Sequence, residues 1–279
     1  MRDLQPVADM TNPLYIRMGN PLLKPSYTNT FTLNFNSYNQ KHQRNIVASA
    51  LVENVINNVT SLVVYDSETG VRTTSPVNMN GNWRAMGSFS LNTPLFDSKS
   101  WLFRTYSYLQ YSNQNGYTTL NQSDPLKSSV KHFTGRQNLQ LTWRTSSLEV
   151  AVRGELSYNN SYHTIRQSRS ETFDYRSGGD IRWYLPWGFE LHSDATYFLR
   201  SGYKDQDPNR LIWNCMLSKA FFKRKQLLLR FKVYDLLQEE NSLNRSIQAT
   251  AIRDTESNVL GRYFMFHAIV RLNMMGKKL

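Results

Sequence analysis

The sequence contains a single cysteine, Cys215, so an internal disulfide and a thiolate metal cluster are both excluded. Charged residues make up only 19% of the 279 residues and aromatic residues reach 13%, which argues against disordered, collagenous and coiled-coil chains. No run approaches the roughly 18 apolar residues that a membrane-spanning helix needs. The stretch 1–6 lacks an apolar core and a small-residue cleavage site, so we expect no signal peptide.

The net charge of +12 raises the question of a nucleic-acid partner. Lysine and arginine are scattered singly, and the dense groups are limited to Lys223-Arg224-Lys225 and Lys277-Lys278. A nucleic-acid-binding surface needs a basic stripe or patch, so this distribution predicts no such partner. The five histidines are widely separated, and the sequence has no nucleophile elbow or phosphate-binding loop. We therefore expect no metal site, no cofactor and no enzymatic activity.

Hydrophobic and polar residues alternate along much of the chain. The clearest case is 148–159, and the same period of two recurs in 136–144, 173–185, 189–199 and 227–233. Side chains alternate between the two faces of a β-strand, so each segment predicts a strand with one apolar face and one polar, charged face. No segment has the pattern of an amphipathic helix.

Weaker segments complete a set of eleven predicted strands, most of them longer than the about 9 to 11 residues that a tilted strand needs to cross a bilayer. The predicted strands are 27–38, 44–56, 82–92, 99–112, 135–145, 148–159, 171–185, 189–200, 210–221, 226–236 and 260–273.

The connections between these strands alternate in length. Short connections fall near 39–43, 93–98, 146–147, 186–188 and 222–225, and longer polar ones near 57–81, 113–134, 160–170, 201–209 and 237–259. Tight turns at one rim and long loops at the other are typical of outer-membrane barrels. The first long connection predicts a projecting hairpin, formed by 59–65 and 71–75.

The six tryptophans fit the same arrangement. Four lie within a few residues of short turns and two begin strands that follow long connections, as expected for two aromatic girdles at the membrane interfaces. A sandwich core, which is the alternative, favours positions in the middle of strands. The first group is Trp101, Trp143, Trp183 and Trp187, and the second is Trp83 and Trp213.

We therefore predict an all-β fold, in which 1–279 is an antiparallel transmembrane β-barrel domain and 1–26 is an extracellular lead-in segment. An odd number of strands would pair parallel strands if the sheet closed on itself, whereas single-chain bacterial barrels have even numbers. Twice the predicted number gives the 22 strands of plugged outer-membrane transporters. The chain is thus predicted to form the C-terminal half of such a barrel, or an open curled sheet if alone, without a plug domain.

Three segments resemble a known family. Gly19 to Pro25 resembles the Gly-Asn-Pro-x-Leu-Lys-Pro segment of TonB-dependent receptor barrels and of their relatives, the outer-membrane protein β-barrel family. Val233 to Leu237 resembles the Val-x-Asp-Leu-Phe-Asn segment that this family carries near its penultimate strand, and Gly261 to Leu272 resembles its closing strand. The resemblance extends over nearly the whole chain.

This resemblance implies a non-catalytic receptor or transporter barrel in the outer membrane of a Gram-negative cell, which captures or imports a nutrient. The implied partners are outer-membrane lipid, a missing N-terminal barrel half with its plug, TonB acting indirectly, and a surface lipoprotein. Two alternatives remain open at this point. One is a soluble β-sandwich that binds carbohydrate or serves as an adhesin-type surface module, and the other is a complete small membrane pore.

The candidate functional residues are the charged side chains on the polar strand faces. An arginine or lysine that faces lipid at the midplane costs about 2 to 4 kcal/mol, so the alternation predicts that these side chains face the lumen. There they form cross-strand ion pairs or, in an intact receptor, contact a plug or line a wet channel. The candidates are Arg136, Arg144, Glu149, Arg153, Glu155, Asp174, Arg176, Asp180, Arg182, Glu190, Asp194, Arg230 and Lys232.

Overall fold

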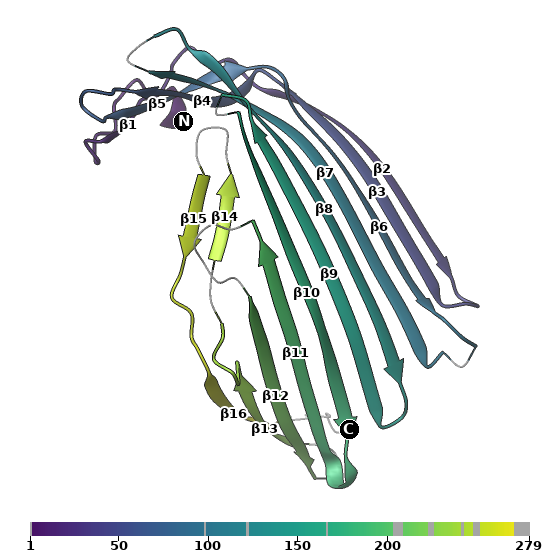
Figure 1. The fold of residues 1–279 in the computed structure, drawn as a ribbon. Helices are drawn as coiled ribbons and strands as arrows, with labels where there is room; N and C mark the ends of the chain where they lie inside the picture. Colours follow the sequence, from purple (N-terminus) through teal and green to yellow (C-terminus); the bar gives the residue numbers. More distant parts are fainter. Residues whose placement is uncertain are drawn as a thin grey trace, which may run out of the picture.

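The structure is a computed structural model of the chain. It describes residues 2–97, 99–120, 123–165, 167–202, 209–222, 226–240, 243–247 and 252–270. Among these residues, fourteen strands form one large curved sheet and two more form a separate hairpin (Figure 1). The described ranges also include two short 3-10 helices, η1 (Arg2–Leu4) and η2 (Pro186–Gly188). Within the described ranges, no helix has the length and apolar character needed to cross a membrane.

An antiparallel meander makes up most of the large sheet. Its strands, in spatial order, are β2 (Tyr27–Asn39), β3 (Arg44–Ile56), β6 (Asn82–Pro94), β7 (Trp101–Leu120), β8 (Leu126–Arg144), β9 (Leu148–His163), β10 (Ser168–Tyr184), β11 (Phe189–Ser201), β12 (Arg210–Phe221), β13 (Leu227–Tyr234) and β16 (Tyr263–Val270). Within the described residues, β2 pairs only with β3 and β16 only with β13, so both edges of the sheet are open. Because direction alternates along this odd-numbered meander, β2 and β16 run the same way.

The remaining strands lie at the rim where β3 ends and β6 begins. The hairpin of β4 (Asn58–Tyr65) and β5 (Arg72–Met79) is antiparallel, and β4 pairs in parallel with the last residues of β7. The short strand β1 (Tyr15–Arg17) pairs in parallel with β5. The strands β14 (Leu243–Ile247) and β15 (Ile252–Glu256) form the separate hairpin. The hairpin predicted after the second strand is therefore confirmed.

The predicted strands correspond one to one to the strands of the meander, and the bounds of β3 and β12 agree to the residue. The prediction was wrong for the connections 113–134 and 160–170, which are largely strand, and for 237–259, which contains β14 and β15. Polar residues do not end a strand beyond the bilayer, because water solvates both faces there while the β7–β8 ladder still pairs the backbone groups. The predicted strand end at 271–273 and both basic clusters lie outside the described residues.

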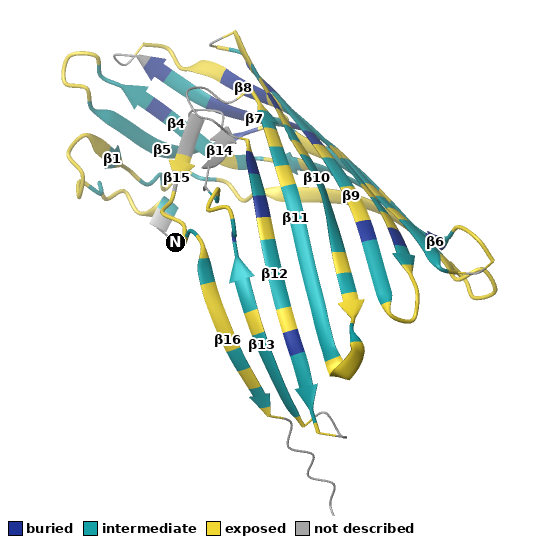
Figure 2. Cartoon of the chain, turned by 60° about the horizontal axis from the view of Figure 1, so that its bottom comes forward, coloured by how far each residue is buried: buried dark blue, intermediate teal, exposed yellow. Residues whose placement is uncertain are grey.

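The two faces of the sheet differ in how far their apolar side chains are exposed. On β9, Val152 is 63% exposed on the convex face, whereas the adjacent Ala151 is only 2% exposed on the opposite, concave face. On β12 the outward-facing Trp213 and Leu217 are likewise exposed, and Figure 2 shows exposed segments recurring along this strand. A soluble sandwich would bury the apolar face against a second sheet. The exposure of Val152 and Leu156 therefore contradicts the sandwich alternative.

The Gly-Asn-Pro segment attaches the lead-in segment to the β4–β5 hairpin. Asn20 donates from Nδ2 to the carbonyl of Pro76 at 3.0 Å and accepts at Oδ1 from the backbone N–H of Leu22 at 2.9 Å. Glycine is required at position 19, since a Cβ there would lie 2.0 Å from the carbonyl oxygen of Gln5. The first of the three resembling segments therefore packs the lead-in segment against β5.

The second motif organises the loop that follows β13. Asp235 is buried and its carboxylate accepts hydrogen bonds from the backbone N–H groups of Glu239 (3.0 Å) and Glu240 (2.9 Å). Its own N–H donates to Oδ1 of Asn214 on β12 at 3.0 Å. Aspartate is suited to stabilising this loop, because its short side chain can accept hydrogen bonds from loop N–H groups that have no partner in a neighbouring strand.

Candidate functional site

The strand register places all the predicted lumen-facing charges on the concave face. Paired residues in adjacent strands point to the same side of a sheet, and the pairing links the charged positions into continuous rows across it. One such row runs from Arg144 through Glu149 and Arg182 to His192, and another from Asp180 to Asp194. The members of the set are Arg136, Arg144, Glu149, Arg153, Glu155, Asp174, Arg176, Asp180, Arg182, Glu190, Asp194, Arg230 and Lys232.

Most of these charges form ion pairs between neighbouring strands. The N–O distances are 2.6 Å for Arg144–Glu149, 3.4 Å for Arg153–Asp180, 3.6 Å for Arg176–Glu155, 3.6 Å for Arg182–Glu190 and 3.0 Å for Arg200–Asp174. Asp194 instead accepts from Nδ2 of Asn214 at 2.9 Å. Ion pairs between neighbouring strands therefore balance much of the charge within the wall.

A few cations on this face have no acidic partner within the described residues: Arg104, Arg136, Arg230 and Lys232. Lys232 donates from Nζ to the hydroxyl of Tyr234 at 3.0 Å. Uncompensated cations on a largely paired surface give the concave face a local positive excess, which favours an anionic contact.

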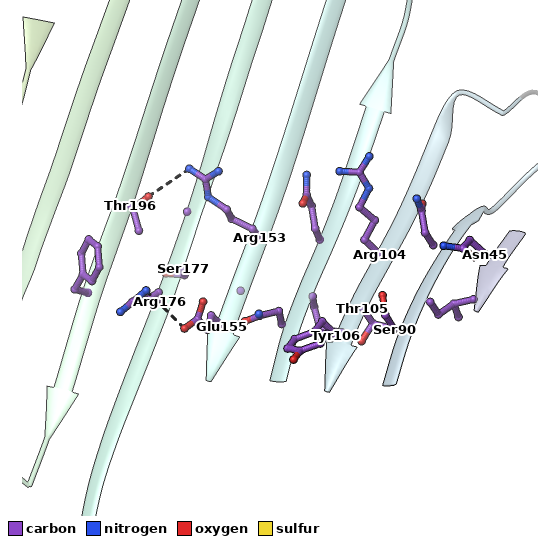
Figure 3. A pocket seen from close by; sticks show the side chains of 18 residues that line it. Asn45, Ser90, Arg104, Thr105, Tyr106, Arg153, Glu155, Arg176, Ser177 and Thr196 are labelled. Atoms are coloured by element: carbon purple, nitrogen blue, oxygen red, sulfur yellow. Dashed lines mark hydrogen bonds and ion pairs between the residues drawn. The ribbon is translucent and has the colours of Figure 1, made fainter. Parts of the chain in front are cut away.

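A cavity of about 640 Å³ lies over this face and is lined by residues from β3 to β11. Figure 3 shows Arg104, Arg153 and Arg176 projecting into it from three strands. Arg153 donates from Nη2 to Oγ1 of Thr196 at 3.4 Å, and Arg176 lies 3.6 Å from Glu155. Many of the other lining side chains carry amide or hydroxyl groups, so the cavity offers several hydrogen bonds to a polar ligand.

Sequence reasoning missed five charged residues on this face: Glu53, Arg84, Arg104, Arg200 and Arg210. Glu53 and Arg84 pair at 3.0 Å, and Arg210 lies 3.3 Å from Glu240. The guanidinium of Arg210 also stacks 4.6 Å from the ring of Phe198. The signal for Arg200 was available, because it continues the alternation of β11, whereas Arg84 and Arg104 stand in strands with weaker alternation. The described residues contain no cluster of three metal-ligating side chains.

The convex face has aromatic side chains at both ends and an apolar band between them. Trp101 and Trp143 lie 6.2 Å apart next to short turns, and Trp183 and the 87% exposed Trp187 stand at another turn. At the opposite end, Trp83 contacts the ring of Tyr111 at 5.2 Å. Trp213 also points to this face, where its Nε1 donates to Oγ of Ser193 at 2.9 Å.

The distance between the two aromatic zones matches a membrane. Trp143 belongs to the aromatic zone next to the short turns, called the lower zone here. Phe133 pairs with Tyr111 in the opposite, upper zone, and both residues are on the same face of β8. At about 3.4 Å per residue and a tilt of about 40°, their separation spans about 26 Å of membrane thickness, close to the about 25 Å apolar band of outer-membrane barrels. Between these zones, the outward positions of the described strands carry no charged side chain.

A curved antiparallel sheet with this apolar band, aromatic ends and a charged concave face is the wall of a transmembrane β-barrel. Residues 1–178 match the model of the outer membrane protein beta-barrel family, and the chain belongs to this family. Its place is accordingly the outer membrane. No curated protein and no solved structure matches the chain.

Proposed function

We propose that the chain is part of the wall of a TonB-dependent-receptor-like barrel, which captures or imports a nutrient without catalysing a reaction. The observation that carries the proposal is the direction of the two open edges. β2 and β16 run the same way, and their unpaired backbone groups are intolerable in hydrocarbon. Direct closure would make a parallel seam, so antiparallel closure requires an odd number of further strands.

The large receptor barrels fit this requirement best. Eleven further strands would give the 22 strands that enclose a plug. Barrel diameter grows with strand number, so a ring of only a few more strands would leave less room above the concave cavity than a 22-stranded barrel does. In this proposal the additional strands and the plug come from polypeptide outside the 279 residues, TonB acts through the plug, and a surface lipoprotein covers the outer rim.

Photo-cross-linking in the native outer membrane tests the closure. Benzoylphenylalanine replaces Phe31 on β2 or Phe266 on β16, and cross-linked peptides are identified by mass spectrometry. Each edge is expected to link to a strand that runs opposite to β2 and β16 and does not belong to the 279 residues. Leu139, in the middle of the sheet, is the control position and should yield no foreign strand. A direct link between β2 and β16, with no foreign strand linked at either edge, would exclude the proposed barrel.

The ligand proposed for the concave cavity is anionic, because Arg104 has no ion-pair partner among the described residues and two further arginines line the same space. Calorimetry on the protein extracted with its native partners, with citrate as a polyanionic probe and sucrose as a neutral one, tests this charge preference. Arg104→Gln should weaken the citrate signal, whereas Arg44→Gln, at the turn between β2 and β3, should not change it. Equal responses to citrate and sucrose would contradict the assignment.

A further inference from the structure

A second cavity, of about 460 Å³, lies on the convex face, where β7 to β10 run side by side. Its floor is aromatic and includes Tyr111, Phe133 and Tyr158. The rings of Phe133 and Tyr158 are 6.1 Å apart, and Tyr158 lies 4.6 Å from Phe173 on β10. This floor is therefore a packed surface that continues the upper aromatic zone.

Two cations, Lys131 and Arg169, stand on the side of this floor that is away from the membrane midplane. Lys131 is two positions beyond Phe133 on the same face of β8, so its Cα is about 7 Å further along the strand. Since Phe133 is at the edge of the apolar band, the ammonium group of Lys131 reaches the level of the lipid headgroups.

The local charge is positive. Lys131 is exposed and has no ion-pair partner within the described residues. The nearby carboxylate of Glu171 lies 2.8 Å from Nε of Arg169 and also accepts from the Tyr158 hydroxyl at 3.1 Å and from Nδ2 of Asn160 at 3.0 Å. All three contacts involve the same carboxylate oxygen, Oε1, and Arg169 offsets the charge of Glu171. The terminal guanidinium nitrogens of Arg169 keep their donors for a ligand.

Lys219, an outward-facing cation at the opposite rim, provides a comparison for Lys131. Lys219, near the end of β12, holds its ammonium 4.3 Å from the ring of Phe189 and 5.1 Å from that of Phe221. Its charge is thus already engaged by two aromatic faces. Lys131 makes no such ring contact in the described residues, although aromatic rings lie just below it.

We propose that the convex cavity binds the phosphorylated headgroup of an outer-leaflet lipid. Lys131 and Arg169 hold the phosphate from two strands, while the aromatic floor supports the apolar part of the same molecule. Phosphate oxygens suit a guanidinium and an ammonium, and the adjoining apolar floor favours a lipid over free phosphate. The inference depends on the membrane position of the sheet and not on the proposed transport function.

Native mass spectrometry of the full chain, purified from the outer membrane in mild detergent and stripped of lipid, tests the site. The probe is lipid A with both phosphates, and lipid A without phosphate is its control. At about 1 kcal/mol per cation, Lys131→Gln/Arg169→Gln should weaken binding about thirtyfold. Lys219→Gln, which removes an outward cation at the other rim, should leave binding within about twofold of the parent protein.

Three outcomes would overturn the proposal. These are equal binding by the parent protein and the double variant, equal binding of lipid A with and without phosphate, and full displacement of lipid A by millimolar inorganic phosphate. Glu171→Gln provides a test if the double variant does not fold. It removes the carboxylate that pairs with Arg169 and should tighten binding about fivefold. Unchanged or weaker binding by this variant would also contradict the site.

Discussion

Asp174 on β10 and Arg200 on β11 occupy directly paired register positions, and Nε of Arg200 lies 3.0 Å from Oδ1 of Asp174. The two side chains are only 16% and 12% exposed, whereas Arg144 in the pair with Glu149 is 59% exposed. The concave wall therefore contains ion pairs of two kinds, one shielded by its neighbours and one open to solvent. Their contributions to stability should differ accordingly.

Asp174→Asn should lower the free energy of unfolding by about 2 kcal/mol, because Arg200 keeps its charge in a shielded site and loses its anionic partner. Glu149→Gln should cost less than about 1 kcal/mol, since solvent screens the pair that it breaks. Urea unfolding of the full chain in lipid vesicles, followed by tryptophan fluorescence, measures both values. Equal losses in the two variants would show that burial does not separate the two kinds of pair.

The opposite polarity of the two faces can be tested at adjacent residues on β8. Leu139 points to the convex face and Asn138 to the concave face, close to the middle of the apolar band. Leu139→Arg should lower the free energy of unfolding by about 2 to 4 kcal/mol, because the guanidinium would enter hydrocarbon. Asn138→Arg, which places the same group opposite Glu155, should change stability by less than about 1 kcal/mol. A larger loss for Asn138→Arg would invert the assignment of the faces.

Much of this architecture could be predicted from the sequence, because a strand that separates lipid from water must alternate strictly. On β9 and β10 that alternation identified both the strands and the direction of Arg153 and Asp180. It failed above the membrane, where the extensions of β7 and β8 face water on both sides and no longer need to alternate. Their continuation depends on pairing between strands, which no local pattern records.

The candidate site was predictable in part for the same reason. Single-strand patterns place a charge on a face, but the partner across the sheet depends on register. Arg176 lies near Glu155 and also 5.3 Å from the ring of Phe198, two contacts set by neighbours on opposite sides. The convex cavity was missed because Lys131 and Arg169 belong to segments predicted to be loops.

The turn of the β4–β5 hairpin should respond to acid. Hydrogen bonds from the side chain and backbone of Thr69 and from the backbone of Glu68 lower the pKa of Asp66. The ionised form is therefore favoured in the folded turn, so its stabilising effect is full above the unfolded pKa of about 3.9 and is lost as pH falls through the lower folded pKa. Amide exchange at Gly70, which donates to the carbonyl of Asp66 at 2.9 Å, reports the opening.

Asp66→Asn is the matched variant for this turn. Asparagine keeps an acceptor for the two backbone donors but has no titrating carboxyl group, so the acid-dependent increase in exchange at Gly70 should disappear. An unchanged pH profile in this variant would assign the acid response to another group.

The single cysteine provides a test of the convex face without added charge. Cys215 is on the outward face of β12, beside Trp213 and 3.4 Å from Oγ of Ser193, whereas Met216 points to the concave side opposite Lys232. A thiolate must form in water before it reacts with a maleimide, so a membrane-impermeant maleimide should label Cys215 about tenfold more slowly than a cysteine on the water-filled side.

Cys215→Ser/Met216→Cys moves the thiol by one position to that side. Labelling in intact membranes and after urea denaturation, which normalises intrinsic reactivity, compares the two proteins. Faster labelling of Cys215 than of the cysteine at position 216 would place water on the convex face and lipid on the charged one.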